Sequence, residues 1–230
     1  MTERTADLLL RGASVYCGKG LPEDYDFVAV KDNRIVDAGY EGQETELIGS
    51  RTRVITLDKF VALANENHVS VRLHACGEGA VRAALDAYES AARKTVHWKP
   101  RHQIEHIESV QPWDIPRFKA LGVVASVQPQ HIVSGIPTFG DNCYPEMLGS
   151  ERDRYTWPFK SLLDSGAVLA GGSDAPVVKG NPFYGMYCGI KREHPDGTPP
   201  GGWNPKEKLT IQELLHAYTW GAAYAEHREH

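Results

Sequence analysis

The sequence predicts an α/β protein assembled from βα units, because three apolar runs each end in a functional side chain. The first run, VRLH, ends in His74 and passes through glycines into residues 80–88, where apolar side chains recur at helical spacing. The second run ends in His106, and the third, AVLAGGSD, ends in Asp174. In barrels built from βα units, the carboxyl ends of the strands converge on one face and form the active site.

Two imidazoles and one carboxylate at converging strand ends form a ligand set suited to a hydrolytic divalent metal. Each residue taken singly has an ordinary alternative. Most histidines are partly buried or surface residues, and the Asp of GGSDAP is more often a turn or cap residue. The repeated placement at strand ends favours the metal site. Cys76, two residues after His74, is either an accessory ligand or a small packing residue.

Residues 1–57 read as short strands and carry no catalytic group of their own. The tetrapeptide KDNR at 31–34, between two apolar segments, predicts a hairpin, because Asp and Asn tolerate the conformations of tight turns. The pattern changes abruptly at residues 57–62. We therefore expect a small β module over residues 1–60 and an α/β domain over residues 61–230.

A further apolar run, VVASVQ at residues 123–128, lies between the runs that end in His106 and Asp174 and places further polar groups near the same face. Gln128 and His131 are candidates for substrate contact at the mouth of the site, with polar loop residues as the alternative. Trp157 is a third candidate. The Gly- and Pro-containing segments 132–157 and 175–208 are expected to be loops, and a loop of this length often covers a site.

Composition limits the classes of protein that fit. The 230 residues are 41% apolar and 24% charged, as in soluble globular proteins, and the formal charge of −5 provides no basic field for nucleic acid. No apolar stretch approaches the roughly 18–20 residues that span a membrane, and the amino terminus does not resemble a secretory signal. We expect a cytoplasmic protein. Its four cysteines, which show no CxxC pair, are expected to be free thiols.

Motifs in a fixed order resemble the metal-dependent amidohydrolase superfamily, and more narrowly its amidohydrolase-3 branch, which includes N-substituted formamide deformylases. The resemblance implies a TIM-type (β/α) barrel with a β-sandwich, metal-ligand roles for His74, His106 and Asp174, and proton exchange with the attacking water by Asp174. It also implies one divalent ion, with zinc expected. The motifs are HACGEGAVRAALDAYE, PRHQIEH, LGVVASVQP, LGSER, WPFKSLLDSG, GSDAPV, NPFYGMY and WNPKEKLTIQELLHAYTWGAAYA.

The sequence also departs from that family pattern. The family carries an HxH pair on its first barrel strand, and no HxH occurs upstream of His74. About four strand units are recognisable, against eight in a closed barrel. We therefore expect a partial TIM-type barrel that corresponds to the last four strand units, preceded by a small amino-terminal β-sandwich module. The unpaired edges of such a sheet would favour a homo-oligomer.

Two functions are compatible with these features. The first is a metal-dependent hydrolase that cleaves carbon–nitrogen bonds in a small amide-like substrate by means of metal-activated water. The alternative is a catalytically silent relative, or a fragment, that acts as a binding or regulatory module. Neither reading includes a nucleic-acid or membrane partner.

Overall fold

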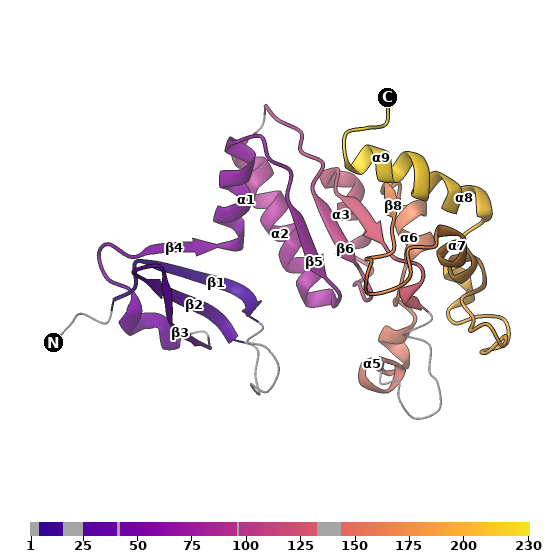
Figure 1. The fold of residues 1–230 in the computed structure, drawn as a ribbon, viewed down its shortest axis with the longest axis horizontal. Helices are drawn as coiled ribbons and strands as arrows, with labels where there is room; N and C mark the ends of the chain where they lie inside the picture. Colours follow the sequence, from indigo (N-terminus) through magenta and orange to yellow (C-terminus); the bar gives the residue numbers. More distant parts are fainter. Residues whose placement is uncertain (1–4, 16–24, 41, 96, 133–143) are drawn as a thin grey trace.

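A computed structural model describes residues 5–15, 25–40, 42–95, 97–132 and 144–230, which form two sheets (Figure 1). The first sheet is mixed and has the strand order β3-β2-β1-β4. The second is parallel throughout and has the order β5-β6-β7-β8. The strands are β1 Leu8–Val15, β2 Tyr25–Lys31, β3 Arg34–Gly39, β4 Arg53–Thr56, β5 Arg72–Ala75, β6 Gln103–His106, β7 Val124–Val127 and β8 Leu169–Gly171.

Helices follow the strands of the parallel sheet in βα order. The helices are α1 Leu57–Glu66, α2 Glu78–Lys94, α3 Ile115–Leu121, α5 Tyr144–Asp153, α6 Phe159–Asp164, α7 Pro182–Lys191, α8 Ile211–His216 and α9 Ala222–Ala225, with short 3-10 helices η1 Gln43–Leu47 and η2 Pro205–Glu207 and the π-helical turn η3 Ala217–Gly221. The α/β fold with a parallel sheet and a small mixed sheet agrees with the expected class.

The mixed sheet contains the predicted hairpin. Strands β2 and β3 pair antiparallel, and Asp32 and Asn33 between them adopt left-handed φ angles of 49° and 59°. Behind the sheet lies a small apolar core of Ala6, Leu9, Phe27, Ala29 and Leu47. The described residues of this module form one sheet, so the second layer of a β-sandwich stays a prediction. The same holds for the boundary between residues 60 and 61.

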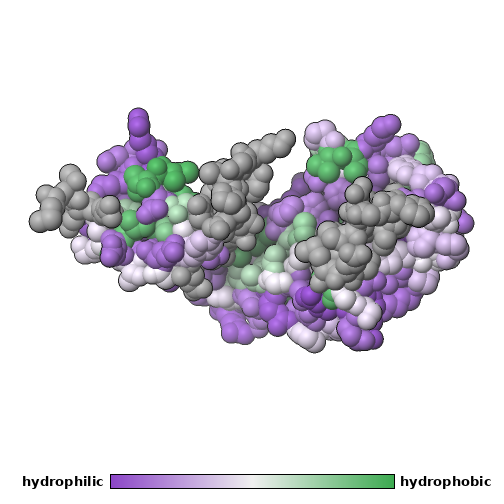
Figure 2. All heavy atoms as spheres, turned by 90° about the horizontal axis from the view of Figure 1, so that it is seen from below, coloured by the Kyte–Doolittle hydropathy of each residue, from purple (hydrophilic) through white to green (hydrophobic). Residues whose placement is uncertain are grey.

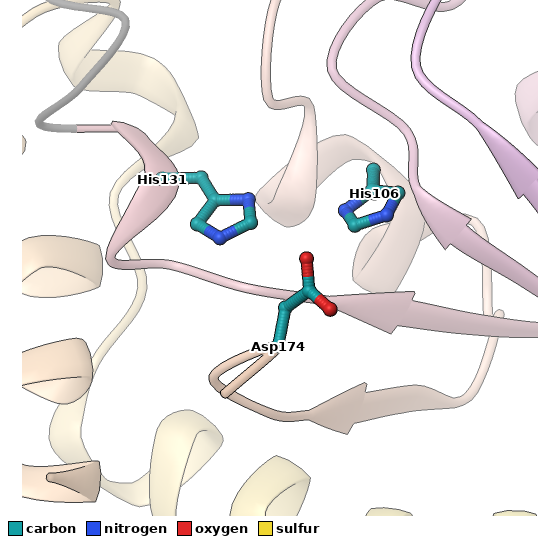
Figure 3. Close-up of side chains that lie close together, drawn as sticks. All are labelled: His106, His131 and Asp174. Carbon is teal, nitrogen blue, oxygen red and sulfur yellow. The ribbon is translucent and has the colours of Figure 1, made fainter. Parts of the chain in front are cut away.

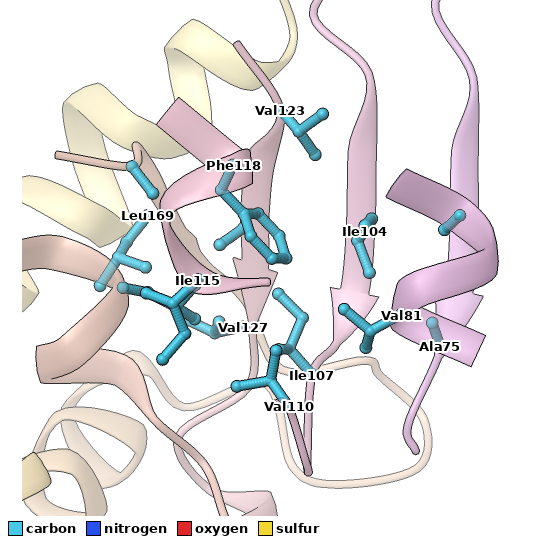
Figure 4. Close-up of a cluster of buried hydrophobic side chains, with 14 of the residues drawn as sticks. Ala75, Val81, Ile104, Ile107, Val110, Ile115, Phe118, Val123, Val127 and Leu169 are labelled. Atoms are coloured by element: carbon cyan, nitrogen blue, oxygen red, sulfur yellow. The ribbon is translucent and has the colours of Figure 1, made fainter. Parts of the chain in front are cut away.

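Alternate residues of the parallel strands face opposite sides of the sheet. Leu73, Ile104, Ala125 and Leu169 are register partners on one side, where helices cover the main hydrophobic core (Figure 4). This core contains Val81 of α2, Phe118 of α3 and Leu162 of α6, each fully buried. Helix α3 ends at Gly122, whose φ of 67° is left-handed.

The carboxyl-terminal helix crosses from the helix-covered side to the opposite side of the sheet. Tyr218 packs on the helix side, whereas Ala225 contacts Val124 and Ala170 on the other side. The crossing point is Gly221, where a Cβ atom would lie 2.0 Å from the carbonyl oxygen of Leu169. The chain therefore passes closely along β8, the edge strand at this side of the sheet.

Two segments differ from their expectation as loops. The segment 175–208 is not a loop throughout, because it contains helix α7, whose first turn is capped by the Asn181 side chain accepting a hydrogen bond from the amide of Phe183. The prediction was wrong because proline suits the first turn of a helix as well as a loop. Within 132–157, residues 133–143 lie outside the described residues, and α5 occupies most of the remainder.

On the face shown in Figure 2 the described residues are largely hydrophilic, with apolar side chains gathered in separate patches. Three apolar residues of α1 and of its connection to β5 are half exposed: Phe60, Leu63 and Val69. Among the described helices, none has both the length and the apolar character needed to cross a membrane.

Candidate metal site at the carboxyl ends of the parallel strands

Three potential ligands from three neighbouring strands meet at one end of the parallel sheet. His106, His131 and Asp174 each offer a ligand atom, and these atoms all lie within 4.8 Å of one another. The two imidazoles and the carboxylate point toward a common centre (Figure 3). His106 is buried, His131 is intermediate and Asp174 is exposed, so the group opens to solvent on the Asp174 side.

Local backbone geometry places these side chains. His106 is the last residue of β6, and its φ of 78° turns the chain out of the strand; Asp174, three residues after β8, has φ 54°. His131 follows β7 after a turn in which its amide donates to the carbonyl of Gln128. Left-handed φ angles are uncommon for residues other than glycine and are concentrated at functional sites.

The group has the features expected of a site that receives a cation. Nδ1 of His106 and Nε2 of His131 are buried and have no hydrogen-bond partner among the described residues. Buried polar atoms are normally satisfied, so these two nitrogens are available to a ligand. Imidazole nitrogens and one carboxylate are ligands of zinc, and three protein ligands leave a position for water in catalytic zinc sites. The residues present therefore fit a divalent ion.

Electrostatics favour the coordinating form of His131. Burial lowers the pKa of His131, and the neighbouring His106 lowers it further, whereas Glu108 and Asp174 act in the opposite direction. A lowered pKa keeps the imidazole neutral near pH 7, and the neutral form is the one that binds metal.

His74, predicted as a ligand, lies beside this group rather than within it. Its ring contacts that of His106 edge-on, with 4.3 Å between the ring centroids. Its Nε2 lies 3.4 Å from Sγ of Cys76. Burial raises the pKa of the Cys76 thiol to about 11, with further contributions from the negative charges of Glu108 and Asp174. The role of His74 as a metal ligand stays a prediction.

Gln128 and Trp157, two of the candidates for substrate contact, occupy different surroundings. Gln128 is buried, and its Nε2 donates to Oε2 of Glu105 at 2.9 Å. Trp157 is 2% exposed and packs edge-on against Trp203, while its carbonyl accepts a hydrogen bond from the buried Arg192. Trp157 thus lies in the core, and the substrate roles of both residues stay predictions.

The third candidate, His131, is the one that the fold brings to His106 and Asp174. Sequence reasoning placed it near substrate and did not include it among the ligands. The same signal that selected His74 and His106 was present, because His131 closely follows the apolar run VVASVQ that forms β7. The intervening Gln-Pro-Gln separated the histidine from the apolar run.

Comparisons with known proteins identify the family of this chain. A model of the amidohydrolase family, its amidohydrolase-3 branch, matches residues 33–230. "Protein LONG AFTER FAR-RED 3" of Arabidopsis thaliana is 35% identical over 175 residues, which are 76% of this chain and 29% of that protein. "Putative amidohydrolase YtcJ" of Bacillus subtilis is 28% identical over 73% of this chain and 30% of its own length. "N-substituted formamide deformylase" of Arthrobacter pascens is 24% identical over 84% and 34%.

Solved structures give the same result. An uncharacterized metal-dependent hydrolase from Pyrococcus furiosus aligns with a TM-score of 0.60 and 29% identity, covering 75% of this chain and 32% of that one. A second, from Pyrococcus horikoshii, aligns with a TM-score of 0.62 and 25% identity, over 78% and 35%. The chain spans about a third of the length of these relatives. The family match covers most of the chain, and we conclude that this chain belongs to the amidohydrolase family.

Proposed function

We propose that this protein is a metal-dependent hydrolase that cleaves carbon–nitrogen bonds in small amide-like molecules. The observation that carries the proposal is the meeting of His106, His131 and Asp174 ligand atoms within 4.8 Å at three strand ends. The name of the deformylase relative supports the bond type, and the family supports hydrolysis. We propose zinc as the ion, one per chain, because imidazole and carboxylate ligands suit it.

The chain's own residues divide the chemistry between them. A bound zinc ion would lower the pKa of water enough to provide a nucleophile near neutral pH. His106 and His131 would hold the ion, with His74 at the side of the group. The exposed carboxylate of Asp174 would accept the proton of the attacking water and return it to the leaving nitrogen.

We propose further that the parallel sheet corresponds to the second half of a TIM-type barrel. Four parallel strands with the main hydrophobic core under helices on one side, and polar residues at their carboxyl ends, resemble the pattern of such barrels. In a closed barrel β5 and β8 would each have another neighbour, whereas both are edge strands in the described part of this chain.

The test of the hydrolase is a measurement of bound metal and of activity together. Purified protein should contain about one zinc ion per chain by elemental analysis, and should release amine from simple N-substituted formamides. His106→Ala should lose both properties. His97→Ala removes an exposed histidine and serves as the control. If the unaltered protein binds no divalent ion, the proposal is wrong.

A second candidate is a binding or regulatory module without turnover. It is favoured by the four-stranded sheet, since closure of a TIM-type barrel takes eight strands. This module would bind the ion, and bind amide-like molecules in a metal-dependent way, without releasing amine. Calorimetric titration of a formamide in the presence of zinc, beside the activity assay, separates the two candidates.

We also propose that the chain self-associates through β5. The residues on this edge strand whose backbone groups point outward are Arg72 and His74, because Val71 and Ala75 direct their carbonyls to β6. Helix α1, which precedes β5 in the chain, and its connection to β5 carry the half-exposed Phe60, Leu63 and Val69. Exposed strand edges pair readily with another chain. Sedimentation should show a dimer at micromolar concentration, and a monomer at all concentrations would contradict this proposal.

A further inference from the structure

A hydrogen bond between two side chains connects the strand that ends in His106 with the segment that leads to His131. Nε2 of Gln128, the residue after β7, donates to Oε2 of Glu105 on β6 at 2.9 Å. A carboxylate can only accept, so the NH₂ end of Gln128 faces Glu105 and its Oε1 faces away. Glu105 also forms an ion pair with Arg72 of β5, whose Nε lies 3.1 Å from the other carboxylate oxygen. The carboxylate is therefore held from both neighbours of β6, strand β5 and the end of β7.

This bond lies where the register between the two strands ends. The last register pair of β6 and β7 is Glu105 with Ser126. His106 directly follows Glu105 and turns out of the sheet with φ 78°. Gln128 begins the turn in which the amide of His131 donates to the Gln128 carbonyl at 2.9 Å. The side-chain bond thus joins the two residues from which these turns start, so it contributes to the separation of the two imidazoles.

The burial of Gln128 costs stability. Gln128 is 4% exposed, and its Oε1 is buried without a hydrogen-bond partner among the described residues. A buried acceptor in this state is destabilising. A crosslink that stabilises the sheet is the ordinary alternative for the bond to Glu105, but an apolar side chain at this position would avoid the cost. The polar side chain here therefore points to a role other than stability.

We propose that Glu105 and Gln128 are positioning residues, which hold the imidazoles of His106 and His131 at the separation that a divalent ion requires. The two rings are nearly parallel, with 5.6 Å between their centroids. Ligand atoms of a metal site must lie within about 0.5 Å of the productive geometry, and hydrogen bonds behind the ligands provide this precision. The inference rests on the metal site proposed above and adds the residues that set its geometry.

The zinc affinity of the full chain, measured by calorimetry, tests this role. Gln128→Met keeps the length of the side chain but removes the bond, and its dissociation constant for zinc should rise roughly tenfold to a hundredfold, as when an outer partner of a ligand is removed. The urea midpoint of metal-free Gln128→Met should stay unchanged, because the buried acceptor is removed together with the donor. A purely structural crosslink would give the opposite result, a lower midpoint and an unchanged affinity. Gln130→Met, the same substitution in the same turn, is the matched control and should bind zinc as the unaltered protein does.

Variants at the other end of the bond complete the test. Glu105→Met should lose the same affinity, and the double variant with Gln128→Met should lose no more than either single variant, because each change removes the same bond. In the exchange Glu105→Gln with Gln128→Glu, the bond can form again with donor and acceptor reversed and with the net charge unchanged. This exchange should bind zinc more tightly than the Met variants, and it tests the inference even if Gln128→Met does not fold.

The outcomes separate this inference from the hydrolase proposal. If Gln128→Met binds zinc as tightly as the unaltered protein, or if the losses of the two Met variants add in the double variant, the positioning role is wrong and the hydrolase proposal stands. An exchange variant that binds zinc no better than Glu105→Met would also overturn the positioning role. If the unaltered protein binds no divalent ion, both proposals fail.

Discussion

Polar groups at the amino end and at the carboxyl end of the parallel sheet differ in what they contact. At the amino end, Arg101 makes a two-pronged ion pair with Glu229 and also donates to the carbonyl of Tyr224. Nε2 of Gln103 donates to the carbonyl of Ala225 at 3.0 Å. These contacts connect the strands to the last helical turn, so most of the polar groups here stabilise the fold.

The amino end also has two buried atoms without a partner, Nε2 of His102 and Oε1 of Gln103, but at the carboxyl end such atoms belong to residues that could share a metal ion. His106 and His131 each have a buried nitrogen without a hydrogen bond among the described residues. His106 and Asp174 adopt left-handed backbone angles. Buried groups without hydrogen bonds cost stability. Such groups, together with strained backbone angles, are typical of ligand-binding sites. One sheet thus has an end that holds the chain together and an end that is available for chemistry.

The largest difference between the two ends is expected from adding one methyl group at each. In Gly221→Ala the new Cβ would lie 2.0 Å from the carbonyl oxygen of Leu169, so the helix must move away from β8. We expect a loss of about 3 kcal/mol in the free energy of unfolding. Gly79→Ala, in α2 after β5, meets nothing within 4 Å and should gain up to about 1 kcal/mol. Urea unfolding of both metal-free variants measures the difference, and equal effects would contradict it.

Two buried histidines at the two ends of β6, His102 before the strand and His106 as its last residue, sharpen the comparison. His102 stacks on Tyr88 with ring centroids 4.4 Å apart, and its Nδ1 accepts a hydrogen bond from the amide of Val71. We expect His102→Ala to lose about 2 kcal/mol of unfolding free energy and to keep its metal affinity.

For His106→Ala the expected result is reversed. The metal-free protein should lose less than about 1 kcal/mol, because the unpartnered Nδ1 is removed with the ring. The rise in melting temperature that zinc produces in the unaltered protein should disappear. Calorimetric scans with and without zinc measure both quantities, and a zinc-dependent rise that survives in His106→Ala would exclude His106 as a ligand.

The parallel sheet could be predicted from the sequence, whereas the full ligand set could not. Apolar runs with a polar end specify a βα unit locally, so the four strands and the positions of His74, His106 and Asp174 followed from pattern alone. Which of the residues after the strands meet depends on how each chain segment turns out of the sheet. The turn at Gln128 brings His131 to His106 and Asp174. Hydrophobic periodicity does not predict such a turn.

The crossing of the carboxyl-terminal helix to the other side of the sheet could not be predicted from the sequence either. The segment 211–225 has a helical pattern, and the predicted family motif covers it, but the pattern does not show that its end changes sides. That outcome depends on the single close approach at Gly221 and on the contact of Ala225 with Val124 and Ala170. Hydropathy patterns do not predict long-range contacts between small residues.

His102, at the amino end of the parallel sheet, should make the free energy of unfolding depend on pH. Burial lowers the pKa of His102 to about 4, from an ordinary 6.5. As pH falls from about 6.5 to 4, the unfolded chain binds a proton that the folded chain does not, so unfolding becomes easier. The metal-free protein should therefore lose stability over this range, and His102→Gln should lose less. Urea midpoints at pH 7, 6 and 5 measure the two slopes; parallel slopes would show that His102 does not cause the loss.

The smallest effect is expected at Glu229, in the carboxyl-terminal segment that contacts the amino end of the parallel sheet. The hydrogen bond from Arg101 is the main cause that lowers the pKa of Glu229 to about 2, from an ordinary 4.5. Because the folded state prefers the ionised carboxylate, this contribution is fully present above about pH 4.5 and is lost as pH falls toward 2.

Melting temperatures of the metal-free protein between pH 5 and 2.5 should therefore decline more steeply than those of Glu229→Gln. Arg101→Lys keeps the charge but cannot form the two-pronged pair, and it should fall between them. The Arg101 side chain of this pair is 20% exposed, so salt should reduce the difference. A slope that is equal in all three proteins would mean that the last turn is held to the sheet by the apolar contacts of Ala225 and the amide of Gln103 alone, and that charge pairing adds nothing to the amino end.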